Sequence, residues 1–333
     1  MRPRPRPRPL ALGLLLAAWG IGISVRGSTA QVPALSSQDA ARDRRVAITI
    51  DDLPKNGGDG GVESARYVTE SILAALEDHS VSAVGFVISE RVTVPGQTDA
   101  RMDMLGEWVE RGHELGNHTY SHLPFHGTPV EAYIDDAIQG DRIPRTLMEA
   151  AGRSLRYFRH PFNSTGPTPE AKMRFAETAE RLGYVLTPFT VEHADYAFDA
   201  IYSHAHGTGN VQLRDSVGRA YLDQLDTAFT FAERMSRETF GREIPQIFLI
   251  HTNEINAAHL SSMLQRLTAR GYRFVTLESA LEDPAYATED VYVGRWGWSW
   301  FHRWRIGLQM EPLLREEPDP PAWILEQYEA LPR

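Results

Sequence analysis

The sequence predicts an α/β fold, a distorted (β/α)7-type barrel with a helical insertion and an aromatic-rich C-terminal tail. Short apolar, β-branched runs alternate with segments of helical period about seven times along the chain. The residues with metal-binding or acid–base side chains follow directly after these apolar runs. Because active sites of such barrels lie at the carboxyl ends of the strands, this order predicts one site at that end.

The first thirty residues are expected to be an export signal. Arginines at positions 2, 4, 6 and 8 precede the apolar stretch 10–25, and small residues end at Ala30, where we expect cleavage. That stretch is short for crossing a bilayer, so we expect no stable membrane span after cleavage; an uncleaved anchor stays an alternative. The protein would then be periplasmic or extracellular. Residues 31–44 are small and polar and are predicted to be a linker.

Composition limits the partners and the kind of metal site. Residues 1–30 hold five arginines and no acidic residue, so their removal moves the formal net charge from -10 to -15. Nucleic acid is therefore excluded as a partner. The chain has no cysteine, which excludes disulfides and thiolate ligands. Any metal must be held by oxygen and imidazole nitrogen. No feature of the sequence indicates an oligomeric state.

The barrel domain is predicted to span residues 45–285 and to begin with the buried strand Val46–Ile50. Glycines end several helices, and Thr168-Pro169 begins one. Pro144 predicts a kink or break in the helix that contains it. Further strands are predicted at 83–88, 155–158, 184–187, 247–250 and 273–276, and helices at 65–77, 102–111, 130–151, 169–182, 217–239 and 258–270, with the helical insertion at about 198–241.

Residues 286–333 form the predicted C-terminal tail, which is expected to pack on the barrel. Four of the seven tryptophans lie between residues 296 and 304. Aromatic faces stack on sugar rings, so the tail could extend a glycan cleft. We favour the other interpretation, in which Trp296, Trp298 and Trp300 lie flat against the barrel wall as a strap, because large exposed rings promote aggregation.

Two acids and two histidines could hold a divalent metal. Asp51 and Asp52 close the first strand, and His118 and His122 follow in the segment His118-Thr-Tyr-Ser-His122. A catalytic metal needs about three protein donors and an open position, which two imidazoles and one carboxylate supply. The second carboxylate stays free for proton transfer. The histidine spacing places both rings on one face if the backbone there is helical.

Other candidates are ambiguous when they are taken singly. His113-Glu114 invites a zinc-protease interpretation, but His118 lies one position too far along to complete His-Glu-x-x-His. Arg159 follows a strand run and could either serve a site or only cap a carboxylate. A lone His251 at a strand end is more often a core residue than a catalytic one.

Five segments together carry a resemblance to a known family. In order and spacing they resemble the motifs of the polysaccharide deacetylase family, also called the NodB-homology domain or carbohydrate esterase family 4. The resemblance covers about residues 45–281. The segments are Thr49-Ile-Asp-Asp52, His118-Thr-Tyr-Ser-His122, Arg159-His-Pro-Phe162, Glu192-His-Ala-Asp-Tyr196 and Leu249-Ile-His251.

The resemblance implies a role for each motif. Asp52, His118 and His122 would bind the metal, usually zinc in this family. Asp51 would act as the base toward the attacking water, and Arg159 would keep Asp51 charged and oriented.

The later motifs imply the rest of the site. The backbone N–H of Phe162 would meet the oxyanion. His251 would protonate the leaving amine, with Asp195 raising its pKa. Leu249 and Tyr196 would line the acetyl pocket and the groove.

The implied substrate is an acetylated glycan, either peptidoglycan or a chitin-like polymer with N-acetyl groups. Leu53-Pro54, Glu192 and Tyr196 depart from the residues common in the family, so the sugar-reading groove is expected to differ. Two alternatives stay open. One is hydrolysis of an O-acetyl ester or a small cyclic amide, and the other is an inactive secreted glycan-binding module.

Overall fold

The computed structural model describes residues 44–56 and 61–331. The predicted export signal at 1–30 and nearly all of the linker lie outside the described residues. Within the described part of the chain, no helix is both long enough and apolar enough to span a membrane.

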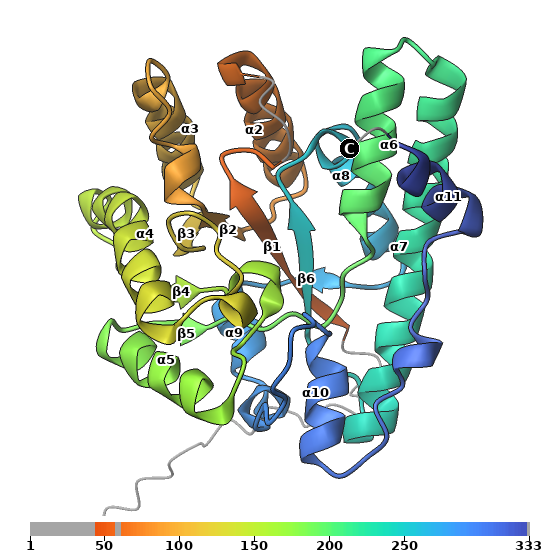
Figure 1. Ribbon diagram of the computed structural model, residues 1–333. Helices are drawn as coiled ribbons and strands as arrows, with labels where there is room; N and C mark the ends of the chain where they lie inside the picture. Colours follow the sequence, from red (N-terminus) through yellow and green to blue (C-terminus); the bar gives the residue numbers. More distant parts are fainter. Residues whose placement is uncertain (1–43, 57–60, 332–333) are drawn as a thin grey trace, which may run out of the picture. The chain divides into compact units, whose positions relative to one another are not determined.

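The strands and helices alternate as the sequence predicts (Figure 1). The strands are β1 (Arg45–Leu53), β2 (Ala83–Val87), β3 (Glu114–Asn117), β4 (Tyr157–Phe158), β5 (Val185–Leu186), β6 (Gln246–His251) and β7 (Arg273–Phe274). The helices are α2 (Gly61–Asp78), α3 (Thr98–Glu110), α4 (Val130–Ala150), α5 (Pro169–Arg181), α6 (Asp195–Gly207), α7 (Val211–Phe240), α8 (Glu254–Ala269), α9 (Leu277–Leu281), α10 (Trp300–Gly307) and α11 (Ala322–Ala330).

All strand pairs are parallel, in the order β5-β4-β3-β2-β1-β6, with β7 paired to the start of β1. The gap between β5 and β6 is bridged by the segment after β5. There, the Thr190 N–H donates to Ile247 O at 2.9 Å and the Leu249 N–H donates to Val191 O at 2.9 Å. The sheet therefore curls into the predicted distorted barrel, and this fold prediction is confirmed.

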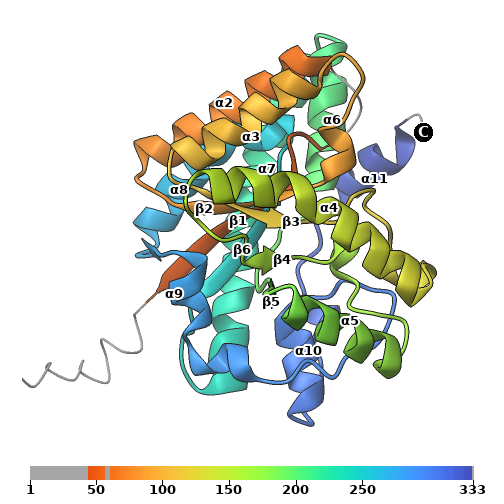
Figure 2. The same cartoon turned by 90° about the vertical axis from the view of Figure 1, so that its left-hand side faces the viewer.

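Alternation along β1 separates two apolar cores. Val46, Ile48 and Ile50 belong to the large core between the strands and the surrounding helices. Ala47 belongs to a small cluster with Val84, Phe86, Tyr157, Ile247, Leu277 and Ala280, which fills the barrel interior. Helices α2 and α3 run side by side over the outer face of the sheet (Figure 2). Since neighbouring side chains on a strand point to opposite faces, the residues at 49 and 51 continue the interior row.

Two regions differ from the expectation. The insertion is a pair of helices, because Thr208, Gly209 and Asn210 interrupt it and the Asn210 side chain caps α7 by accepting the Leu213 N–H at 3.1 Å. The strands β4, β5 and β7 are each two residues long, shorter than predicted.

The flat strap predicted for the tryptophans is wrong. Trp296 is 54% exposed, whereas Trp304 is buried within α10. The alternating pattern ends at Trp300, where a helix begins, so Trp300 and Trp304 lie one turn apart.

The buried face of α2 is expected to contribute to the stability of the fold. Leu73 is fully buried in the large core, so Leu73→Ala should lower the free energy of unfolding by about 2–5 kcal/mol. Tyr67 on the same helix is 53% exposed, and Tyr67→Ala should change it by less than about 0.5 kcal/mol. Urea unfolding of both variants measures the difference, and equal losses would contradict this packing of α2.

Candidate functional site

Asp51 and Asp52 both face the barrel mouth because the backbone leaves the strand geometry between them. Asp51 continues the interior row of β1 and pairs in register with His251 of β6. A regular strand would turn Asp52 to the opposite face. Instead, Asp52 adopts a left-handed conformation, with φ at 73°, and the pairing with β2 shifts register between Ile50 and Leu53. This irregularity directs both carboxylates toward one centre.

The two histidines of the second motif converge through a loop. The backbone is not helical here, since Thr119 and His122 have φ values of 68° and 59°. The Asn117 side chain accepts the Thr119 N–H at 2.8 Å, and the Thr119 hydroxyl accepts the His122 N–H at 3.0 Å. These bonds fix a turn in which the imidazole centroids of His118 and His122 are 5.0 Å apart.

Asp52, His118 and His122 offer one ligand atom each within 4.8 Å of one another. The Asp52 Oδ1 atom is 3.5 Å from His118 Nε2 and 3.4 Å from His122 Nε2. It is buried and has no hydrogen-bond partner among the described residues. Two ligands bonded at about 2.1 Å to a tetrahedral zinc would lie about 3.4 Å apart. The spacing therefore fits a divalent metal.

Neighbouring groups keep His118 and His122 neutral, the form that can bind a metal. His118 Nδ1 is 2.8 Å from the carbonyl oxygen of Arg159, so Nδ1 carries the proton and Nε2 faces the cluster with its lone pair. Burial lowers the pKa of His118, against the raising effect of Asp51 and Asp52. Burial, helped by His118, lowers the pKa of His122 to about 4. Both rings are thus neutral near pH 7, as metal ligands must be.

Arg91 contacts the metal-site carboxylate, a contact for which the sequence held no signal. Its Nη1 atom lies 3.1 Å from Asp52 Oδ2, the oxygen that faces away from the histidines. Burial opposes charge on Asp52, but Arg91 and the nearby histidines outweigh it and hold the pKa of Asp52 well below its usual range. The carboxylate stays ionised, with Oδ1 left for a metal.

Asp51 is held by a buried arginine. Arg159 Nη1 donates to Asp51 Oδ1 at 2.8 Å and to the Thr49 hydroxyl at 2.9 Å. Its Nη2 donates to Pro188 O at 3.0 Å, and the guanidinium lies 4.5 Å from the ring centroid of Phe86. The second oxygen, Asp51 Oδ2, faces His118 Nε2 at 3.7 Å. Asp51 thus points toward the cluster with one oxygen occupied.

The half-buried His251 pairs with the buried Asp195. His251 Nδ1 lies 2.8 Å from Asp195 Oδ1, and the His251 N–H donates to Asp195 Oδ2 at 2.8 Å. Asn253 and Asn256 also donate to Asp195 Oδ2. Burial alone would lower the pKa of His251, but the contact with Asp195 raises it to about 10. His251 is therefore an imidazolium at neutral pH, with Nε2–H available to donate.

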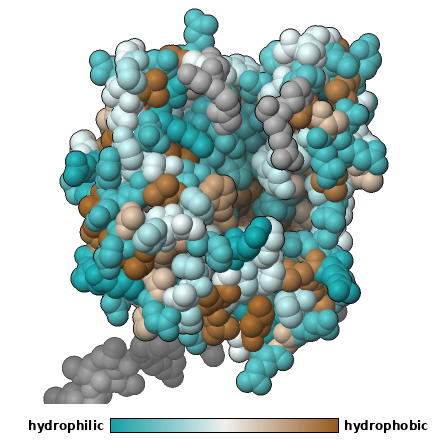
Figure 3. All heavy atoms as spheres, in the orientation of Figure 1, coloured by the Kyte–Doolittle hydropathy of each residue, from teal (hydrophilic) through white to brown (hydrophobic). Residues whose placement is uncertain are grey.

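The remaining predicted residues surround this centre. The ring of Phe162 is 56% exposed and lies 4.6 Å from the ring of His122. Leu249 is buried on β6. Tyr196 on α6 is exposed, and its ring centroid lies 5.8 Å from that of Tyr328 on α11. Above the upper ends of β1 and β6 in Figure 1, the surface is hollowed (Figure 3).

Glu192, the acidic residue that departs from the usual fourth motif, lies beside a cavity. Glu192 Oε2 accepts the Ala194 N–H at 2.9 Å, and burial raises the pKa of Glu192 to about 7. Glu192, Tyr196 and Glu317 line a cavity of about 200 Å³ between this motif and the C-terminal tail. Among the predicted site residues, Asp51, Asp52, His118, His122 and Arg159 form one cluster, which Phe162 and the His251–Asp195 pair adjoin. Leu249 lies two residues before His251 on β6, and Tyr196 lines the cavity beside Glu192.

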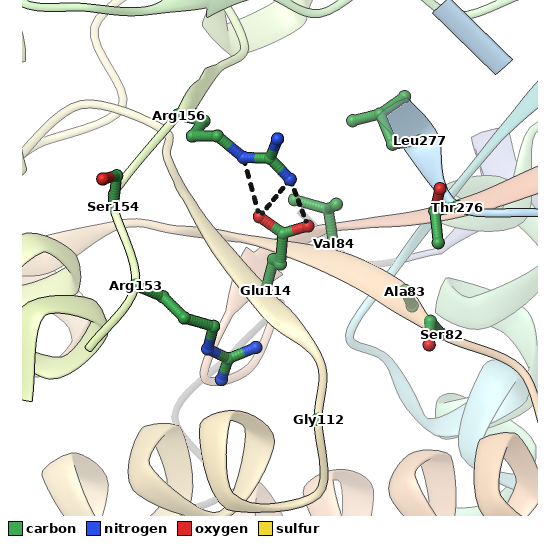
Figure 4. Close-up of a pocket in the computed structure, with 10 residues that line it drawn as sticks. All are labelled: Ser82, Ala83, Val84, Gly112, Glu114, Arg153, Ser154, Arg156, Thr276 and Leu277. Atoms are coloured by element: carbon green, nitrogen blue, oxygen red, sulfur yellow. Dashed lines mark hydrogen bonds and ion pairs between the residues drawn. The ribbon is translucent and has the colours of Figure 1, made fainter. Parts of the chain in front are cut away.

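A different hollow, of about 300 Å³, lies near the amino ends of β2 and β3 (Figure 4). There, Arg156 Nη2 pairs with Glu114 Oε1 at 2.9 Å, and Arg153 donates to the backbone oxygens of His113 and Val109. Both arginines are thus bound by groups of the protein itself, as expected for the stability face of a barrel.

Comparisons with known proteins agree with this geometry. The family model described as polysaccharide deacetylase matches residues 38–186. A putative polysaccharide deacetylase of Bacillus subtilis, YheN, is 24% identical over 74% of this chain and 72% of its own length. A peptidoglycan-N-acetylglucosamine deacetylase of Bacillus cereus is 26% identical over 54% of this chain. That alignment spans 60% of the Bacillus cereus protein, less than two thirds.

A solved structure shares the fold. A carbohydrate esterase family 4 pseudoenzyme from Bacillus anthracis matches with a TM-score of 0.50 and 17% identity, over 73% of this chain and 67% of its own. The family model over residues 38–186 and the curated relatives thus show a likeness to polysaccharide deacetylases, and the solved structure shows the same fold.

Proposed function

We propose that this protein removes acetyl groups from N-acetylated sugars of peptidoglycan or a chitin-like glycan, and that it uses a divalent metal, zinc, to do so. The observation that carries the proposal is the convergence of Asp52, His118 and His122 around a buried carboxylate oxygen that has no hydrogen-bond partner among the described residues. The substrate class is supported by the Bacillus cereus relative, which is named for deacetylation of peptidoglycan N-acetylglucosamine.

Asp52 Oδ1, His118 Nε2 and His122 Nε2 would hold the metal. When bound, it would polarise the acetyl oxygen and lower the pKa of a water molecule. Arg91 keeps the outer oxygen of Asp52 occupied, so Asp52 would bind through Oδ1 alone. The Arg159 carbonyl keeps His118 in the tautomer that presents Nε2.

Asp51 would accept the proton of the attacking water. Arg159 occupies Asp51 Oδ1 and thereby leaves Oδ2, which faces the cluster, as the acceptor. The bond from Arg159 to the Thr49 hydroxyl fixes the guanidinium, and with it the direction of the carboxylate. A base oriented in this way contributes to proton transfer without moving during the reaction.

His251 would protonate the departing nitrogen. Its Nδ1 is bound to Asp195, which leaves the Nε2–H to donate. The parallel register sets Asp51 and His251 side by side on neighbouring strands, so base and acid can act on one carbonyl carbon. The Phe162 N–H would receive the oxyanion. Leu249 and Tyr196 would line the acetyl pocket and the groove.

We also propose an exported enzyme whose catalytic domain spans residues 45–285. The arginine-led apolar segment near the N-terminus supports export, and polymeric glycans of this kind lie outside the cytoplasmic membrane.

Loss of one ligand should abolish tight metal binding. Asp52→Ala should lower zinc affinity by more than about 100-fold, because loss of a group that only supports a ligand already costs about 10–100-fold. Competition with a chelating dye measures the affinity. Asp51→Asn is the matched control and should bind zinc nearly as tightly as wild type. Wild-type affinity in Asp52→Ala would show that the ligand set is wrong.

Asp51→Asn, the control in the zinc experiment, also tests the proposed role of Asp51 as the base. Asp51→Asn should release acetate from N-acetylglucosamine oligomers about 10²–10⁴-fold more slowly than wild type, because an amide cannot accept the proton. Acetate is measured with the protein loaded with zinc. A variant with the full rate would remove Asp51 from the role, and a wild-type protein that deacetylates no glycan would refute the proposed function.

The pH profile tests the acid. His251 works when protonated, so kcat/KM should fall as pH rises through its pKa, which Asp195 raises to about 10. Asp195→Asn removes that charge and should move the alkaline limb of the profile down by about 1 pH unit or more. Asp199→Asn, one helical turn further along α6, should leave the limb in place. An unmoved limb in Asp195→Asn would exclude His251 as the titrating acid.

A further inference from the structure

We propose that Arg303, in the C-terminal tail, is a positioning residue that holds the third-motif loop in the conformation that presents the Phe162 N–H to the oxyanion. This inference rests on the proposed deacetylase function. It assigns the tryptophan-rich tail a role in the reaction, through the backbone of residues 162–165.

The loop has a conformation that its sequence does not favour. Phe162 and Asn163 are consecutive residues with positive φ, at 55° and 51°. Asparagine tolerates this region, but phenylalanine disfavours it, so the strain lies at Phe162. Such a backbone persists only when the surrounding structure over-determines it.

The side chains of the loop do not supply that constraint. Asn163 Oδ1 and Ser164 Oγ are buried, and neither has a hydrogen-bond partner within the part of the chain that the structure describes. Asn163 N–H bonds to His160 O at 2.9 Å, which closes the turn but does not tie it to the rest of the barrel.

Arg303, about 140 residues later in the chain, connects the loop to the rest of the protein. Its Nη2 atom donates to Asn163 O at 2.6 Å, and its Nη1 atom donates to the Thr165 hydroxyl at 3.2 Å. The side chain is fully buried. One planar guanidinium thus binds the loop at two points, which fixes both its position and its orientation.

The guanidinium is itself held rigidly. Its Nε atom donates to Trp298 O at 2.9 Å, and Asp290 lies 3.3 Å from Nη1. The ring of Trp300 lies 4.0 Å from the guanidinium carbon, at cation–π distance. Lys172 of α5, at 2.7 Å, binds the same Asp290 carboxylate. The tail is therefore bound both to the loop, through Arg303, and to α5, through Asp290.

A second contact brings the tail against Phe162 directly. A Cβ atom placed on Gly297 would lie 2.1 Å from Phe162 O, so only glycine allows this approach. The carbonyl of Phe162 is thus confined from one side while Arg303 holds the following residue. The ring centroid of Phe162 lies 4.6 Å from that of His122, so this loop borders the candidate metal site.

The test compares Arg303→Met with Arg305→Met. Arg305 is a buried arginine of the same helix, but it donates to Glu311 O and the Thr239 hydroxyl, away from the loop. Arg303→Met should lower kcat for acetate release about 100-fold with KM unchanged, since displacement of an oxyanion donor affects only the transition state. Arg305→Met should keep a kcat close to wild type. Arg303→Lys should recover part of the loss.

Hydrogen exchange provides a readout independent of activity. In Arg303→Met, the amides of residues 162–166 should exchange faster, while those of residues 46–52 and the zinc affinity stay as in wild type. Gly297→Ala should give the same pattern and serves if Arg303→Met does not fold. Unchanged exchange and kcat in a folded Arg303→Met would overturn the inference. A wild-type protein without acetate release would instead refute the proposed function.

Discussion

The left-handed backbone at Asp52 is the constraint on which the site depends. Adjacent residues of a strand face opposite sides, so two neighbouring carboxylates can serve one centre only where the strand is broken. The break costs about 1–3 kcal/mol for a residue other than glycine. It is held in place by the Thr252 hydroxyl, which donates to Asp52 O at 2.9 Å, and by the Ile88 N–H, which donates to Leu53 O. These bonds join β1 to both neighbouring strands, so the barrel itself maintains the strained conformation.

The second principle of the site is that each buried carboxylate has its own cation. Arg159 pairs with Asp51, Arg91 pairs with Asp52, and His251 pairs with Asp195. Three uncompensated acids so close together would repel one another and shift toward protonation. Because the two arginines bind outer oxygens, the inner oxygens of Asp51 and Asp52 still face the cluster. The ion pairs that permit burial of the three carboxylates therefore also give each one a separate proposed role. In that proposal, Asp51 is the base, Asp52 is the metal ligand and Asp195 supports the acid.

The sequence predicted the alternation of strands and helices, the barrel and the three side chains that converge as a candidate metal site, because each depends on local pattern or on motif order. It did not predict how His118 and His122 meet. Their i, i+4 spacing suits a helix, whereas a turn made by the Asn117 and Thr119 side chains brings them together. Arg91 and Thr49 were missed for a related reason, since their importance comes only from three-dimensional contact with the two aspartates.

The contacts of the C-terminal tail could not be predicted either, because its partners lie far away along the chain. Alternating tryptophans suggested a flat strap, but Arg303 of the tail binds the third-motif loop, 140 residues earlier in the chain. Arg303 gives up solvation to bind that loop, and burial lowers its pKa even though Asp290 opposes the shift. An arginine desolvated in this way is costly unless its donors are satisfied. Here they are satisfied largely by backbone oxygens and a hydroxyl, which would become unpaired if the loop moved. The strained loop and the buried cation therefore stabilise each other, and neither conformation is expected without the other.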